Sequence, residues 1–99
     1  MEKFIYYGEI FNIYKELLPK NIQEIFSSYF EDNLTLQEIA ENLDVSKSYV
    51  GNVIKNAENK LDNLEGTLHI YENRVKLTNA LEKNDLLEIK NIIKSIIEK

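Results

Sequence analysis

Apolar side chains recur every three to four residues along nearly the whole of this chain, and this spacing is the strongest constraint on its fold. The first apolar stripe runs from Phe4 to Leu18 and stops at Pro19, the only proline of the sequence. A period of about 3.6 residues places apolar groups along one side of an α-helix. With three glycines besides that proline, the chain has too little turn chemistry for an all-β protein. The sequence therefore predicts an all-α fold.

Further stripes divide the chain into five or six helices. After a leading helix at 4–18, we expect helices at about 22–30, 35–43, 46–65, 68–81 and 86–97. Three of them begin at side-chain oxygens that can accept hydrogen bonds from free backbone N–H groups. These expected caps are Thr35 paired with Glu38, Ser46, and Asp85 paired with Glu88. Gly66 and Thr67 either break or bend the fourth helix.

A window of eighteen residues, 36–53, meets the requirements of a helix-turn-helix. Ala40 supplies the small side chain that the first helix needs where the second one crosses it. Asp44 is among the few residue types that adopt a left-handed backbone at low cost, as the turn requires. The apolar residues expected to lock the two helices together are Ile39, Leu43, Val45, Val50 and Val53. A plain helical hairpin with coincidental spacing is the alternative.

Ninety-nine residues, 43% of them hydrophobic, suffice for a single domain with one modest core. We expect one all-helical domain over 1–99, with a leading helix at 4–18, a helix-turn-helix unit at 20–65 and C-terminal helices at 66–99. The absence of cysteine excludes disulfides and thiolate zinc sites. No apolar run exceeds four residues, and the first residues lack the layout of a signal peptide. We therefore expect a cytoplasmic protein without membrane insertion.

The second helix of the motif is the expected recognition helix, whose outward and N-terminal residues contact nucleic acid. The candidate nucleic-acid-binding residues are Ser46, Lys47, Ser48, Tyr49, Asn52, Lys55 and Asn56. Lysine can meet phosphate or guanine, and asparagine can meet adenine or a backbone oxygen. The net charge is −5 overall, and residues 35–65 carry three lysines against six carboxylates. We therefore expect weak binding that is lost at modest salt, with Lys47 and Lys55 contributing most of it.

Groups suited to catalysis are scarce in this sequence. His69 is the only histidine and has no cysteine or Ser-His-Asp set to join, so we expect an ordinary helix residue there. The acidic residues lie mostly opposite the apolar stripes, as on a solvated face, and no glycine-rich phosphate loop is present. We expect a protein that is not an enzyme and that uses neither a metal nor a cofactor.

Two apolar stripes outside the motif are wider than one neighbouring helix can cover. The first is the aromatic stripe Phe4, Tyr7, Phe11 and Tyr14. The second belongs to the last helix and consists of Leu86, Leu87, Ile89, Ile92, Ile93, Ile96 and Ile97. Because large exposed apolar patches are rare on monomers, we expect a homodimer built from these helices. The alternative is that the two stripes cover each other within one chain.

The motif and the residues around it carry a pattern that consists of Leu18-Pro19, Ile25-Phe26, Tyr29, Leu36, Glu38 to Ala40, Val45-Ser46, Val50 and Ala57. This pattern resembles the helix-turn-helix of sigma-factor region 4. A wider set consists of Phe11, Tyr14, Leu17-Leu18, Tyr29 to Leu36, Glu38 to Glu41, Val45 to Lys47, Val50, Ile54-Lys55, Glu58, Leu61, Leu64-Glu65 and Leu68. Over about residues 4–82, this set resembles the YlxM-like family of small bacterial helix-turn-helix proteins more closely.

The resemblance implies a cytoplasmic bacterial protein with a regulatory or accessory role in the signal recognition particle pathway. Contacts with the particle's RNA or with its protein components would follow from that role. Two other hypotheses stay open from the residues alone. One is a DNA-binding transcriptional regulator, and the other is a protein-interaction module that keeps the helix-turn-helix shape without binding nucleic acid. The YlxM-like family commonly has arginine at the positions of Lys47 and Asn56 and an aromatic residue at that of Gly51.

Overall fold

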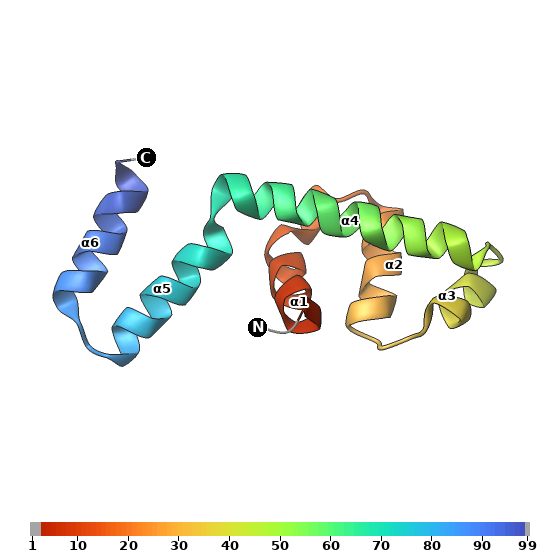
Figure 1. The fold of residues 1–99 in the computed structure, drawn as a ribbon, viewed down its shortest axis with the longest axis horizontal. Helices are drawn as coiled ribbons and strands as arrows, with labels where there is room; N and C mark the ends of the chain where they lie inside the picture. Colours follow the sequence, from red (N-terminus) through yellow and green to blue (C-terminus); the bar gives the residue numbers. More distant parts are fainter. Residues whose placement is uncertain (1–2, 99) are drawn as a thin grey trace.

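The computed structural model describes residues 3–98, which form six α-helices and one short 3-10 helix without any β-strand (Figure 1). The elements are α1 (Lys3–Tyr14), η1 (Lys15–Leu17), α2 (Lys20–Phe30), α3 (Leu36–Leu43), α4 (Lys47–Leu68), α5 (Ile70–Glu82) and α6 (Leu86–Ile97). This arrangement confirms the all-α fold. The leading helix is shorter than the expected 4–18, because its last turn tightens into η1 before Pro19.

The predicted caps of α3, α4 and α6 are all confirmed. Thr35 Oγ1 accepts a hydrogen bond from the Glu38 N–H at 3.1 Å, and the Glu38 carboxylate accepts one from the Thr35 N–H at 2.9 Å. Ser46 Oγ and the Asp85 carboxylate each accept a hydrogen bond from the backbone N–H three residues further on, at 3.0 Å. Each helix therefore begins where a side-chain oxygen can replace the missing backbone acceptor.

Within residues 3–98, four residues that are not glycine have a left-handed backbone; two of them end α3 and α4, and the other two lie in the connections after α2 and α5. They are Asn33, Asp44, His69 and Asn84, with φ between 56° and 59°. Asp44 is the residue that we expected in this conformation. His69 is not an ordinary helix residue, which corrects our expectation: α4 continues through Gly66 and Thr67, and the break falls at His69.

The aromatic stripe of α1 is covered by its own chain. Phe11 and Tyr14 are each 1% exposed, and the ring centroid of Phe11 lies 4.8 Å from that of Phe26 in α2. Figure 1 shows α4 running across both α1 and α2, and core residues of these helices form one cluster. Our expectation that this stripe would pair with a second copy or with the last helix is therefore wrong for its buried part. The α1 helix finds its partners within the bundle.

The contact between α3 and α4 uses fewer residues than the sequence predicted. Ile39 and Ala40 of α3 and Val50 of α4 are buried, as expected. Leu43 is 47% exposed and Val45 is 39% exposed, so neither locks the two helices in the way that we expected. Leu43 is the last residue of α3, and Val45 lies in the turn between α3 and α4.

A buried carboxylate joins the end of α4 to the start of α5. Glu65 accepts a hydrogen bond from the Tyr14 hydroxyl at 2.7 Å and from the N–H groups of Tyr71 and Glu72 at 3.0 and 2.9 Å. The Tyr14 hydroxyl accepts a hydrogen bond from the Ile70 N–H at 3.3 Å. The first three N–H groups of α5 are thus satisfied by side chains of two other helices. This junction sets the direction in which α5 leaves the bundle.

Helices α5 and α6 form a hairpin that projects away from the other four helices (Figure 1). The molecule measures 54 × 24 × 17 Å, and its radius of gyration is 16.8 Å. A compact chain of 100 residues has a radius of gyration of about 13 Å. The difference arises because α6 packs mainly on α5 and leaves its other sides in solvent.

We predict that Glu65→Ala destabilises the fold by about 2–3 kcal/mol, because it leaves a buried hydroxyl and two N–H groups without their acceptor. The measurement is equilibrium unfolding in urea followed by circular dichroism, together with hydrogen exchange at the amides of Tyr71 and Glu72. Glu58→Ala is the matched control in the same helix, since among residues 3–98 the partner of Glu58 is the exposed Lys3, at 3.7 Å. Equal free energies of unfolding for the two variants would contradict the capping role.

A second prediction concerns alkaline pH. Burial, together with the hydrogen bond to Glu65, raises the pKa of Tyr14 from 10.0 to about 12. The protonated hydroxyl is therefore favoured in the folded state, and its contribution to stability is complete below pH 10 and disappears as pH rises to about 12. We expect the difference in free energy of unfolding between wild type and Tyr14→Phe to narrow across this window.

Candidate nucleic-acid interface

The turn between α3 and α4 has the backbone that a helix-turn-helix needs. Asp44 takes φ 56° and ψ 47°, and the N–H of Val45 donates a hydrogen bond to the carbonyl of Ala40 at 3.0 Å. This closure of the last turn of α3 redirects the chain into Ser46, which caps α4. Ala40 is 3% exposed and belongs to the core cluster that also contains Val50 and Ile54 of α4. The recognition helix of such a motif corresponds to the first turns of α4.

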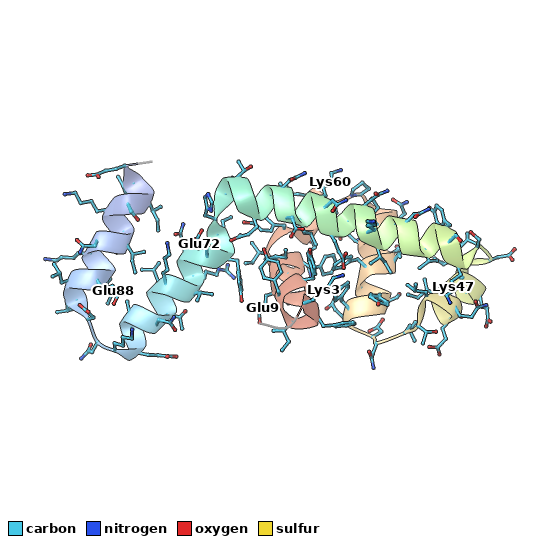
Figure 2. All side chains as sticks on the ribbon, viewed as in Figure 1. Lys3, Glu9, Lys47, Lys60, Glu72 and Glu88 are labelled. Atoms are coloured by element: carbon cyan, nitrogen blue, oxygen red, sulfur yellow. The ribbon has the colours of Figure 1, made fainter. Side chains whose placement is uncertain are left out.

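All seven predicted site residues are exposed to solvent. Four of them share one side of α4, because they are spaced by three or four residues. These four are Ser48, Asn52, Lys55 and Asn56. Ser46 and Lys47 lie instead at the N-terminus of the helix, where Figure 2 places Lys47 beside α3. Tyr49 is 43% exposed at the edge of the same side.

The exposed side of α4 continues beyond the residues that the sequence pointed to. Asn59, Lys60 and Asn63 follow at helical spacing and are exposed, and Figure 2 shows Lys60 on the side of α4 that faces away from α1. The resulting outer face of α4 consists of Ser48, Asn52, Lys55, Asn56, Asn59, Lys60 and Asn63. The sequence has an asparagine at every third or fourth position of this helix, and this spacing could have predicted that the face extends beyond Asn56. Each asparagine offers both donors and an acceptor.

The carboxylates of α4 all have partners on other helices. Glu58 forms an ion pair with Lys3, Asp62 accepts a hydrogen bond from the Tyr7 hydroxyl at 2.8 Å, and Glu65 is buried at the α5 junction. All three acidic groups are thus engaged with α1 or α5. The exposed positions of α4 carry three lysines and one carboxylate, that of Asp62.

The net negative charge of residues 35–65 therefore does not describe the exposed side of α4. Within residues 3–98, Lys47, Lys55 and Lys60 take part in no salt bridge, so their charges are available to a ligand. Glu38, Glu41 and Asp44 are exposed on α3 and its turn, and they confine the basic surface to α4. The outer face of α4 is suited to a polyanion that also offers hydrogen-bonding groups.

A shallow groove of about 680 Å³ lies at the elbow between α4 and α5. Its most polar members are already bound within the chain: Glu65 caps α5, and His69 Nδ1 lies 2.9 Å from a carboxylate oxygen of Glu72. Residues 3–98 hold no group of three or more histidines and carboxylates placed to bind a metal ion. No helix in the described part of the chain is long and apolar enough to cross a membrane.

Comparison with known proteins agrees with the resemblance seen in the sequence. The family model described as "Putative helix-turn-helix protein, YlxM / p13 like" matches residues 1–98, so the match extends into α6 as well. The chain is 36% identical over 101 residues to a probable UPF0122 protein of Mycoplasma mycoides, a match that covers 99% of this chain and 88% of the relative. It is 37% identical over 71 residues to a UPF0122 protein of Limosilactobacillus reuteri, covering 72% of this chain and 63% of that one.

No solved structure matches the chain. The two relatives are bacterial proteins that carry the name of the same family as the matching model. A model match over nearly the full length, together with these identities, establishes the expected membership: this chain belongs to the UPF0122 family of YlxM/p13-like helix-turn-helix proteins.

Proposed function

We propose that this protein is a non-enzymatic nucleic-acid-binding accessory or regulatory protein that uses the outer face of α4. The observation that carries the proposal is the division of α4 into two sides. Its carboxylates are engaged with α1 and α5, whereas its asparagines and unpaired lysines face solvent. A helix with this division, presented by a helix-turn-helix turn, can offer unpaired lysines and asparagines to a phosphate backbone while its own carboxylates are engaged with other helices.

The lysines, asparagines and tyrosine of this surface are suited to different parts of a nucleic acid. Lys55 and Lys60 neutralise phosphates along the helix, while Lys47 and the free N–H groups behind Ser46 do so at its positive N-terminal end. Asn52 and Asn56 lie one turn apart and can hydrogen-bond base edges or sugar oxygens. The half-exposed ring of Tyr49 can stack on an unpaired base.

The balance of these groups favours structured RNA over duplex DNA. Three lysines supply few phosphate contacts, but four asparagines supply many hydrogen-bonding groups. Duplex DNA requires several phosphate contacts for appreciable affinity, whereas unpaired bases in RNA loops expose edges that amide side chains can bind. We therefore propose that the target is an RNA.

The family resemblance suggests that this RNA is the RNA of the signal recognition particle, which the protein would bind in the bacterial cytoplasm. We further propose that the protein acts as a homodimer.

The test is fluorescence anisotropy with labelled signal recognition particle RNA and with a mixed-sequence DNA duplex, from 50 mM to 300 mM salt. We expect the logarithm of RNA affinity to fall with the logarithm of salt concentration with a slope of about −2 to −3, as three lysine–phosphate contacts predict. Lys55→Gln and Lys60→Gln should each reduce that slope by about 0.7 to 1. Asn52→Ala and Asn56→Ala should lower the affinity and leave the slope unchanged.

The matched control is Lys83→Gln, because Lys83 is exposed at the tip of the α5–α6 hairpin, far from α4. It should bind RNA as wild type does. A slope that Lys55→Gln and Lys60→Gln leave unchanged would refute the assignment of the outer face. Tighter binding to the DNA duplex would favour a transcriptional regulator, and no binding to either at 50 mM salt would favour a protein-interaction module.

A further inference from the structure

The α5–α6 hairpin presents an apolar surface that the rest of the chain does not cover. Six large aliphatic residues near its tip and along α6 are 39% to 75% exposed. We call them the hairpin patch: Leu81, Leu86, Leu87, Ile93, Ile96 and Ile97. Figure 1 shows this hairpin at the opposite end of the molecule from α3. Phe11 and Tyr14 of the aromatic stripe are buried in the bundle, whereas the residues of the hairpin patch remain exposed.

Leu86, Ile93 and Ile97 of the patch lie on a different side of α6 from the buried Ile92. Ile92 is the buried residue of α6, and its neighbour Ile93 is 45% exposed. Successive residues on a helix point about 100° apart, so one helix cannot cover both sides. Leu86, Ile89, Ile93 and Ile96 follow a spacing of three, four and three residues. This is the spacing by which a helix packs along a second helix in a coiled coil or a four-helix bundle.

The area of the hairpin patch is sufficient for a stable pair of chains. A fully buried leucine or isoleucine removes roughly 100 Å² of apolar surface from water, so six residues with these exposures present roughly 400 Å². Two copies would bury about 800 Å² of apolar surface, or about 1,200 Å² in total at the apolar fraction usual for homodimers. That total reaches the lower end of the range for specific, stable interfaces, about 1,200–2,000 Å².

The charge distribution favours a second copy of the same chain as the occupant of the hairpin patch. Residues 70–98 contain five acidic and five basic side chains and are neutral, whereas residues 1–69 contain twelve acidic and six basic ones and carry −6. Two hairpins can therefore meet without net repulsion, while the acidic bundles stay at the outer ends. A neutral, aliphatic surface offers nothing to select a nucleic acid or a strongly charged protein.

We propose that the α5–α6 hairpin is a homodimerisation module, in which the hairpin patch of one chain packs on that of a second copy around a two-fold axis. The two hairpins then form a four-helix bundle, and Ile93 lies within its core. This inference rests on the homodimer named in the proposed function and assigns it a surface. It leaves both α4 outer faces free, because they belong to the part of each chain that points away from the hairpins.

The test is sedimentation velocity of the full chain between 1 and 100 µM, without nucleic acid, at 50 mM and 500 mM salt. We expect twice the chain mass of 11.6 kDa at both salt concentrations, because the interface is apolar and neutral. Ile93→Lys and Leu86→Lys should each raise the dimer dissociation constant at least about 100-fold, since symmetry places the lysine on both sides of the interface. Ile5→Lys is the matched control, because Ile5 is 56% exposed on α1.

A wild-type mass of 11.6 kDa at 100 µM would overturn the proposal. A dimer that stays intact in both Ile93→Lys and Leu86→Lys would also overturn it. So would a dimer that Ile5→Lys dissociates as strongly as these two substitutions do. Circular dichroism of each variant shows whether helix content is kept, and the two independent hairpin variants guard against a local folding defect. The result is separable from RNA binding: Ile93→Lys should still bind RNA as a monomer, and Lys55→Gln should remain a dimer.

Discussion

The hydrogen bonds of the Glu65 carboxylate hold the two parts of this molecule together. Glu65 lies near the end of α4, and it accepts hydrogen bonds from a core tyrosine of α1 and from the first turn of α5. A carboxylate at a helix N-terminus satisfies free N–H groups and complements the positive end of the helix dipole. Because the same group is tied to Tyr14, the direction of α5 is fixed relative to the bundle. The projection of the hairpin and the exposure of α6 both depend on this junction.

Helix α4 contacts α1, α2, α3 and α5, and its two sides carry different kinds of residues. One side supplies Val50, Ile54 and Leu61 to the core, with acidic residues at its margin that contact α1. The opposite side consists of asparagines and lysines in solvent. An acidic protein can present a surface suited to a polyanion in this way, because the interaction depends on which charges are near the ligand rather than on the total. The helix-turn-helix supplies only the geometry, and the polar side of α4 supplies the chemistry.

The outer face of α4 and the hairpin patch are separate surfaces of the molecule. The candidate nucleic-acid interface begins beside α3, and the hairpin patch lies at the other end of the long axis (Figure 1). A ligand on one need not displace a partner on the other. The family model spans both parts, so the hairpin belongs to the family's domain as much as the helix-turn-helix does.

The sequence by itself determined the helices, their caps and the left-handed turn at Asp44, because these depend on periodicity and on hydrogen bonds between residues close in the chain. It also identified one end of the candidate interface, from Ser46 to Asn56. Only the tertiary structure decided which groups the carboxylates of α4 contact, that α6 stays largely uncovered and that the chain breaks at His69 rather than Gly66. The contacts of the α4 carboxylates depend on Tyr7, Tyr14 and Lys3, which lie more than fifty residues away in sequence and meet α4 only when the bundle forms.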